Sequence, residues 1–182
     1  MIKTICVYCA SSSQINKVYT DAAAKLGCLL AEKDLTCVCG AGRDGLMRTV
    51  ADACLQNDGK VIGVIPRFMY DEGWWNPYLT NLFITNNIHE RKKKMADLSD
   101  AVIALPGGCG TMEELLEIIT WKQLGLYDGT IVILNVNNYY DPLIQMLKNA
   151  VDEQFMREDQ QTAWAVAATP EEAMGLSFIS TS

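Results

Sequence analysis

A chain of 182 residues with 49% apolar side chains can bury one sizeable core, so we expect a single α/β domain over residues 1–182. Its formal net charge of −7 disfavours nucleic-acid binding, because proteins that neutralise a phosphate backbone are usually basic. Seven cysteines and one histidine suit neither a fully paired disulfide framework nor a Cys/His metal site, and we expect no bound metal.

The first residues enter an apolar run directly and lack the features of a signal peptide. No apolar stretch is long enough to cross a membrane. Cys6 and Cys9 form a CxxC, but residues three apart on a strand point to opposite faces, which disfavours a redox or metal pair. With unpaired cysteines, these features predict a soluble, cytoplasmic protein without a membrane partner.

Apolar runs and helical spacing alternate along the chain. In chain order we predict a strand at residues 2–8, a helix at 18–32, a strand at 35–39, a helix at 46–56 and a strand at 61–65. An irregular stretch at 68–77 follows, then a short strand at 82–85, a helix at 90–98, a strand at 101–105 and a long helix at 111–124. We then expect a strand at 131–134, a helix at 142–154, a strand at 164–167, a short helix from Pro170 and a frayed tail at 177–182.

The predicted strands are continuous apolar runs rather than alternating ones. Such strands are buried on both sides, which is typical of a parallel sheet. The pattern therefore predicts a doubly wound α/β fold with a parallel sheet and helices on both faces. In this fold, ligands bind beyond the carboxyl ends of the strands, near the point where strand order reverses.

The loop after the second strand has the sequence GAGRDG at residues 40–45, a GxGxxG between a strand and a helix. A dinucleotide site would also need an acidic residue about 20 residues further on, and none stands there. A tight turn that needs glycine is a second interpretation. The third is that the loop forms one wall of a mononucleotide site.

The loop after the strand at 101–105 has the sequence PGGCGT at residues 106–111 and opens a helix. Its glycines leave backbone N–H groups free to point inward, and the helix N-terminus adds partial positive charge. The Thr111 hydroxyl supplies a further donor. This loop is the strongest candidate for a phosphate site, although it is not a Walker A loop.

Thr111 and Glu114 have two interpretations. Thr-x-x-Glu is the pattern of a capping box, in which both side chains satisfy the first backbone donors of a helix. A carboxylate one turn from a phosphate cradle is also well placed to contact a sugar. The sequence by itself leaves both open.

The basic segment at residues 89–94 precedes the strand that leads into this loop. Lys93 and Lys94 are expected on a solvated helix face. Met95 follows at core-like spacing, which turns Arg91 inward, where a guanidinium can hold a phosphate or a leaving base. In the irregular stretch, Trp74 and Trp75 suggest a base-stacking wall, a dimer contact or a core role for one of them.

Taken together, these motifs resemble the Lonely Guy family of cytokinin riboside 5′-monophosphate phosphoribohydrolases, whose members were often labelled lysine decarboxylases. The shared elements are PGGxGTxxE at residues 106–114, an Arg-Lys pair at 91–92, CxSS at 9–12 and GLM at 45–47. The likeness continues through TWKQLG at 120–125 and LNV at 134–136, and it covers nearly the whole chain in order.

The resemblance implies a Rossmann-like, nucleotide-binding, dimeric hydrolase that uses no cofactor. It implies cleavage of the N-glycosidic bond of a nucleoside 5′-monophosphate, AMP or an N6-modified AMP, to a free base and ribose 5-phosphate. Arg91 and Glu114 would be the catalytic pair. The implied substrate-binding residues are Glu72, Arg91, Lys92, Gly107, Gly108, Cys109, Gly110, Thr111, Met112, Glu113, Glu114 and Thr120.

The chain departs from the family pattern in four places. Ala41 interrupts a run of glycines, Arg48 replaces a usual glycine, and Cys109 replaces a usual aromatic residue. Residues 69–80 match poorly. A non-catalytic nucleotide-binding module is the alternative that these departures leave open. The decarboxylase label would need pyridoxal phosphate on a lysine, and no lysine stands in a recognisable cofactor motif.

Overall fold

The computed structural model describes residues 2–178, and within them the chain alternates strands and helices as the sequence pattern predicts. The strands are β1 (Thr4–Tyr8), β2 (Thr36–Cys39), β3 (Lys60–Pro66), β4 (Asn81–Thr85), β5 (Ala101–Ala104), β6 (Thr130–Leu134) and β7 (Ala165–Ala167). The α-helices are α1 (Lys17–Glu32), α2 (Gly45–Gln56), α3 (Arg67–Asp71), α4 (Ile88–Asp97), α5 (Cys109–Gln123), α6 (Asp141–Asp152) and α7 (Pro170–Ser177). Two 3₁₀ helices, η1 (Val136–Asn138) and η2 (Glu158–Ala163), flank α6.

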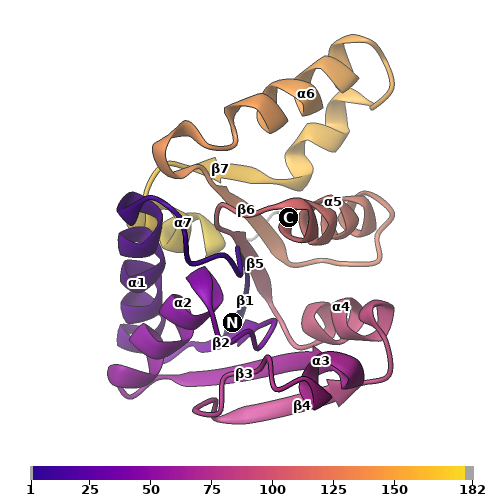
Figure 1. Ribbon diagram of the computed structural model, residues 1–182. Helices are drawn as coiled ribbons and strands as arrows, with labels where there is room; N and C mark the ends of the chain where they lie inside the picture. Colours follow the sequence, from indigo (N-terminus) through magenta and orange to yellow (C-terminus); the bar gives the residue numbers. More distant parts are fainter. Residues whose placement is uncertain (1, 179–182) are drawn as a thin grey trace.

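Within residues 2–178 the strands form one seven-stranded sheet in the order β4-β3-β2-β1-β5-β6-β7, and every pairing is parallel. The chain builds outward from β1 to β4, then returns to place β5 on the other side of β1 (Figure 1). Strand order therefore reverses between β1 and β5. This confirms the predicted doubly wound architecture and puts the switch point at the centre of the sheet.

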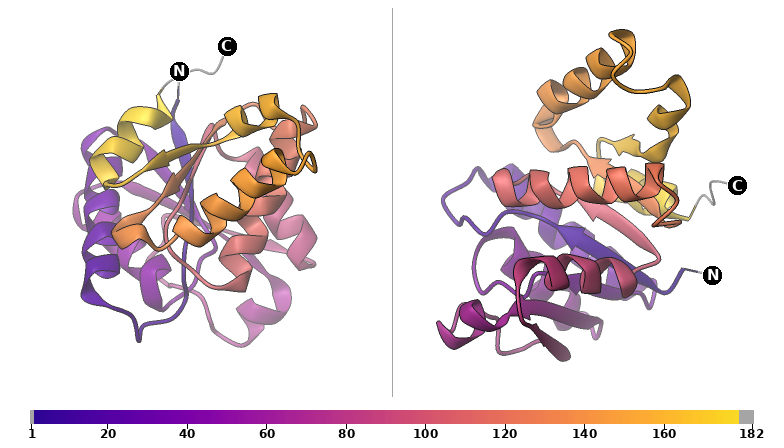
Figure 2. Two further views of the ribbon diagram at one scale, coloured as in Figure 1. Left: turned by 90° about the horizontal axis from the view of Figure 1, so that it is seen from above. Right: turned by 90° about the vertical axis from the view of Figure 1, so that its right-hand side faces the viewer.

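Alternate residues of β1 point into two separate cores. Ile5 and Val7 belong to the core under α1, α2 and α7, whereas Cys6 and Tyr8 belong to the core under α4, α5 and α6. Figure 1 shows the first group of helices on one side of the sheet and α4 and α5 on the other, and the right-hand view in Figure 2 faces the second side. Cys6 and Cys9 lie in different cores, which confirms the prediction that residues three apart here point to opposite faces of the sheet.

Outside the start of α5, which is described with the site, the structure corrects the prediction at two places. The stretch predicted as irregular begins with α3, a five-residue helix that starts directly after Pro66 and is too short to show a periodic pattern. The predicted tail begins too early, because α7 continues through Ser177, which is fully buried and donates from its hydroxyl to the Ala173 carbonyl at 2.8 Å. The rest of that predicted tail, residues 179–182, lies outside the described residues.

No helix formed by residues 2–178 combines the length and the apolar character needed to cross a bilayer.

Candidate functional site

A cavity of about 670 Å³ opens where β1, β2 and β5 end. Residues 9–12 after β1 line it on one side, and residues 108–111 at the start of α5 face them. The loop after β2 contributes Gly40 and residues 42–44. The cavity therefore lies at the switch point of the sheet, where a doubly wound fold binds its ligands.

The start of α5 presents backbone amides to this cavity. The Met112 N–H makes the first helical hydrogen bond, to the Gly108 carbonyl at 3.0 Å. The amides of Cys109, Gly110 and Thr111 precede it and have no acceptor within the helix. Free amides at the positive end of a helix dipole bind phosphate well.

The helix starts two residues earlier than predicted, and this decides between the two interpretations of Thr111. Gly108 is the N-cap residue and makes no side-chain cap. Thr111 is therefore inside the first turn and not at the cap, so the capping-box interpretation is wrong. Its side chain is 4% exposed, lines the cavity and has no hydrogen-bond partner among residues 2–178. A hydroxyl that faces the cavity and has no partner in the described part of the chain is available to a ligand.

Gly107 makes this placement of Thr111 possible. A Cβ atom on Gly107 would lie 2.1 Å from the Thr111 Oγ1 and 2.5 Å from its Cβ. Any larger residue would push the Thr111 side chain away, so the glycine is required by close packing inside the loop.

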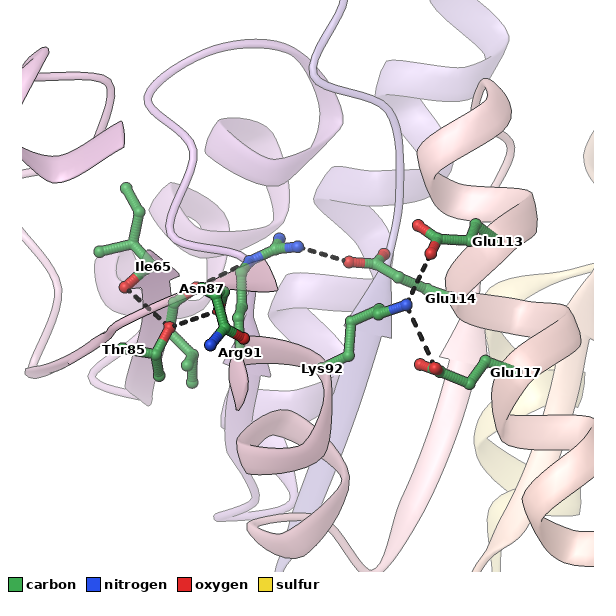
Figure 3. A network of polar contacts seen from close by, with 9 residues as sticks. Ile65, Thr85, Asn87, Arg91, Lys92, Glu113, Glu114 and Glu117 are labelled. Atoms are coloured by element: carbon green, nitrogen blue, oxygen red, sulfur yellow. Dashed lines mark hydrogen bonds and ion pairs between the residues drawn. The ribbon is translucent and has the colours of Figure 1, made fainter. Parts of the chain in front are cut away.

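A buried ion pair closes the inner end of the cavity. Arg91 on α4 donates from Nη1 to Glu114 Oε1 on α5 at 2.8 Å and from Nε to the Val64 carbonyl at 3.1 Å (Figure 3). Both charged side chains are about nine-tenths buried. Gly40 leaves space for the guanidinium, because a Cβ atom there would lie 2.0 Å from Arg91 Nη2. The first glycine loop thus helps to hold the cation of the pair in place.

Burial dominates the environment of Glu114 and raises the pKa of its carboxyl, although the charge and hydrogen bond of Arg91 act in the opposite direction. The carboxyl lines the cavity, and only its Oε1 atom is bonded to Arg91. A carboxyl with a raised pKa beside a fixed cation in a cavity is a typical catalytic arrangement.

Lys92 follows Arg91 on α4 but does not line the cavity. Its Nζ donates to Glu113 Oε1 at 2.6 Å and contacts Glu117 Oε1 at 3.2 Å (Figure 3). Burial acts to lower the pKa of Lys92, but the bonds to the two carboxylates outweigh it and the pKa is raised. Lys92 therefore ties α4 to α5 behind the cavity.

The predicted site residues fall into two groups. Arg91, residues 108–111 and Glu114 line the cavity together. The others lie outside the lining: Gly107 and Met112 adjoin the cradle, Glu113 pairs with Lys92, and Glu72 and Thr120 are exposed. The Thr120 hydroxyl donates to the Leu116 carbonyl at 2.8 Å on the outer face of α5.

The cavity also has a wall of apolar and aromatic side chains that the sequence did not single out as a site. Met47, Met69, Trp74 and Ile88 come from four separate segments of the chain. Trp75 turns the other way and stacks on Tyr70, with ring centroids 5.3 Å apart. Of the three interpretations of Trp74 and Trp75, the wall of a pocket is the one that agrees with the position of Trp74.

The first glycine loop is a wall of the cavity rather than a dinucleotide site. The first amides of α2, those of Leu46 and Met47, both donate to the Ala10 carbonyl, at 2.9 and 3.3 Å. They are not free to hold a pyrophosphate. The position of the loop in the cavity wall agrees with the mononucleotide interpretation. The tight-turn interpretation also agrees with the structure, because Gly45 has a φ of 63° and a Cβ atom there would lie 2.5 Å from the Ser11 backbone.

Arg48, one of the departures from the family pattern, lies outside the cavity. It pairs with Asp52, whose second oxygen accepts from the buried Asn76 amide at 3.2 Å, and its guanidinium lies over the Tyr78 ring. This cluster fastens the segment that carries Trp74 to the outside of α2. The substitution therefore leaves the cavity lining unchanged.

Comparison with known proteins assigns the chain to a family. A family described as "Possible lysine decarboxylase" matches residues 47–176. Cytokinin riboside 5′-monophosphate phosphoribohydrolase LOG5 of Arabidopsis thaliana is 41% identical over 170 residues, which is 93% of this chain and 75% of the relative. The chain belongs to the LOG family. LOG of Oryza sativa subsp. japonica, with the same described activity, is also 41% identical, over 93% of this chain and 70% of its own length.

Solved structures support the fold of this LOG-family protein. The molybdenum cofactor binding protein of Rippkaea orientalis superposes with a TM-score of 0.74 at 20% identity, over 97% of this chain and 95% of that chain. The molybdenum cofactor carrier protein of Chlamydomonas reinhardtii has a TM-score of 0.71 at 18% identity, over 96% and 95%. At such low identity the likeness shows the shared α/β architecture alone.

We predict that Lys92→Met lowers the free energy of unfolding of this LOG-family protein by about 1–2 kcal/mol near neutral pH, because it removes a buried cation from two carboxylates that are partly exposed to water. The folded-state pKa of Lys92 is raised, so its contribution is fully present below the pKa of the unfolded chain and is lost as pH rises through the folded-state pKa. The difference in the free energy of unfolding between the wild type and Lys92→Met should therefore stay constant from neutral pH upward and shrink only in strong alkali. Urea unfolding at several pH values measures it.

Lys93→Met is the matched control. Lys93 is exposed and pairs with Asp97 on the surface of the same helix, so its loss should change stability by less than about 0.5 kcal/mol. An equal cost for the two variants would show that Lys92 is not a buried tie between α4 and α5.

Proposed function

We propose that this LOG-family protein hydrolyses the N-glycosidic bond of a nucleoside 5′-monophosphate, AMP or an N6-modified AMP, to the free base and ribose 5-phosphate. The observation that carries the proposal is the buried Arg91–Glu114 pair beside the free N-terminus of α5 in one cavity. Relatives at about 41% identity are described as cytokinin riboside 5′-monophosphate phosphoribohydrolases, which favours turnover over binding alone.

The 5′-phosphate binds the start of α5 in this proposal. The amides of residues 108–111 and the Thr111 hydroxyl donate to its oxygens, and the helix dipole favours its charge. Cys109 contributes its backbone N–H, so replacement of the family's usual aromatic side chain does not remove a donor. Binding energy from the phosphate then fixes the position of the ribose C1′ atom.

The chemistry takes place one turn further along α5, at Glu114. Loss of the base leaves an oxocarbenium-like ribose, and the Glu114 carboxylate stabilises that positive charge. The carboxylate also holds the attacking water or the neighbouring ribose hydroxyl through the oxygen that Arg91 does not use. The charge and hydrogen bond of Arg91 favour the ionised form of this carboxyl and hold it in place, and the guanidinium stabilises negative charge on the phosphate or the departing base.

The apolar wall of Met47, Met69, Trp74 and Ile88 forms the base pocket in this proposal. The ring of Trp74 offers a stacking surface, and thioether side chains adapt to bases of different shape. Both AMP and an N6-modified AMP are compatible with such a wall.

The remaining predicted substrate-binding residues lie outside the cavity lining, and in this proposal they support the residues that line it. Gly107, Met112, Lys92 and Glu113 hold the cradle and α5 from behind. Glu72 is the C-cap residue of α3 and lies two residues before Trp74 of the apolar wall.

We also propose a cytoplasmic homodimer that works without a cofactor. All seven cysteines lie in the described residues and are free, which suits a reducing compartment. The outer face of α5 leaves Leu116 and Leu124 exposed, and Leu126 follows in the next turn. An exposed apolar stripe on a helix that is already buried on its other side marks a contact surface. Thr120 lies between these leucines and faces the partner subunit in such a dimer.

Incubation with AMP should release free adenine and ribose 5-phosphate, and Glu114→Gln should lower kcat/KM by at least about 100-fold. Gln can still accept a hydrogen bond from Arg91, so the protein should stay folded, but the buried guanidinium loses its counter-charge and the thermal midpoint should fall. Base release followed by chromatography, together with a thermal melt, measures both.

The matched control is Glu117→Gln, one turn further along α5 and outside the cavity lining. It should retain activity close to that of the wild type. Unchanged turnover in Glu114→Gln would remove Glu114 from the catalytic pair, and unfolding of that variant would assign the residue a purely structural role.

For the dimer, we predict that Leu116→Glu gives a monomer, because a charge at the centre of an apolar interface is costly to bury. Light scattering after gel filtration gives the mass of each species. Val18→Glu on α1 is the control, since Val18 is 38% exposed and Leu116 39%, but Val18 lies on the opposite face of the sheet. A Leu116→Glu protein that stays dimeric would place the interface elsewhere, and a monomeric wild type would contradict the dimer itself.

A further inference from the structure

Two adjacent tyrosines in the turn between β6 and α6 reach the loop that precedes the phosphate site. The Tyr139 hydroxyl donates to the Gly107 carbonyl at 2.7 Å, and the Tyr140 hydroxyl donates to the Leu105 carbonyl at 2.8 Å. Neither tyrosine lines the cavity. They therefore hold the cradle from the side away from the ligand.

The bond from Tyr139 fixes the direction of one backbone donor. No peptide bond in the described residues is cis, and in a trans peptide the C=O of one residue and the N–H of the next point in opposite directions. The Gly107 carbonyl points to Tyr139, so the Gly108 N–H points away from Tyr139. Gly107 is buried outside the lining, whereas Gly108 is exposed in the cavity, which places that N–H on the ligand's side.

This peptide needs an external anchor because it joins two glycines. Glycine has almost free access to both signs of φ, so a Gly–Gly peptide can rotate and turn its carbonyl toward the ligand. A carbonyl oxygen facing a phosphate would repel it. Nothing else in the described part of the chain donates to the Gly107 carbonyl through a side chain, so the Tyr139 hydroxyl is the group that selects the productive orientation.

Tyr139 is itself held rigidly. Its ring meets the rings of Tyr19 and Tyr140 edge-on, with centroid distances of 5.9 and 5.1 Å. The turn before it places Asn137 and Asn138 in the left-handed region, with φ of 52° and 59°, and the Tyr140 N–H donates to Asn135 Oδ1 at 2.7 Å. A turn fixed in this way presents the hydroxyl before any ligand arrives.

We propose that Tyr139 is a positioning residue for the phosphate site, where its hydroxyl orients the Gly107–Gly108 peptide so that the Gly108 N–H donates to the ligand's phosphate. The nature of the ligand, a nucleoside 5′-monophosphate, rests on the proposed function. The positioning role rests on the hydrogen bond and on peptide geometry.

Tyr140 provides a built-in contrast. Its hydroxyl anchors the carbonyl of the Leu105–Pro106 peptide, and proline has no N–H. Tyr140 therefore cannot orient a donor through that peptide. Its ring is 1% exposed, so loss of its hydroxyl leaves a buried carbonyl without this partner and costs stability instead.

The test compares Tyr139→Phe, Tyr140→Phe and Tyr19→Phe, which each remove one hydroxyl and keep the ring. Calorimetry gives the dissociation constant of ribose 5-phosphate, which carries the phosphate and has no base to lose, and steady-state assays give kcat and KM for AMP. We expect Tyr139→Phe to weaken ribose 5-phosphate binding about tenfold and to raise KM for AMP similarly. Its thermal midpoint should fall less than that of Tyr140→Phe, because Tyr139 is 40% exposed and Tyr140 is 1% exposed. Tyr140→Phe should lower the thermal midpoint and keep the dissociation constant, and Tyr19→Phe should change neither.

Wild-type affinity for ribose 5-phosphate in Tyr139→Phe, or an equal loss in Tyr140→Phe, would overturn the positioning role while AMP turnover left the proposed function intact. The reverse result is also distinguishable: weaker binding in Tyr139→Phe without AMP turnover by the wild type supports the positioning role and contradicts the proposed function. A wild-type protein that does not bind ribose 5-phosphate contradicts both.

Discussion

The ion pair between Arg91 and Glu114 joins α4 to α5 at the inner end of the cavity, and the other parts of the site are arranged around it. Two charges that are about nine-tenths buried need close partners, because an unpaired ion in such a place is costly. Arg91 meets this need with the Glu114 carboxylate and the Val64 carbonyl. Gly40 must lack a side chain so that the guanidinium fits, and Lys92 ties the same two helices together next to the pair.

A second constraint is that the backbone carbonyls next to the start of α5 already have hydrogen-bond donors. The Pro106 carbonyl accepts from the Ala10 N–H at 3.2 Å, and the Gly107 carbonyl accepts from Tyr139. Because these acceptors are engaged, the amides at the start of α5 are left for a ligand. The same principle explains why the first glycine loop is not an anion site: there the Ala10 carbonyl already takes the first amides of α2. The two glycine loops thus differ in whether the amides of the following helix already have an acceptor.

Much of the fold could be predicted from the sequence because local patterns dictate it. Continuous apolar runs such as Ile131 to Leu134 predict strands buried on both faces, and the parallel sheet confirms this. The errors fall where local patterns are weak. Helix α3 is too short to show helical periodicity. Ser177 is buried by tertiary packing, which the polar residues around it do not predict. The sequence predicts the start of α5 at Thr111, because a residue that caps with its side chain can be recognised in a sequence. The observed N-cap, Gly108, uses no side chain and therefore leaves no such signal.

The sequence by itself determined the strand–helix order, the glycine loop that opens α5 and the inward turn of Arg91, because each depends on residues close together in the chain. It also carried the resemblance to the LOG family, which the relatives confirm. Only the tertiary structure decided that Glu114 pairs with Arg91 rather than capping its helix, that Lys92 faces away from the cavity, and that Tyr139 supports the cradle from 32 residues away. The physical reason is that a side chain's role depends on which group it meets, and in a doubly wound sheet those groups come from distant strands brought together at the switch point.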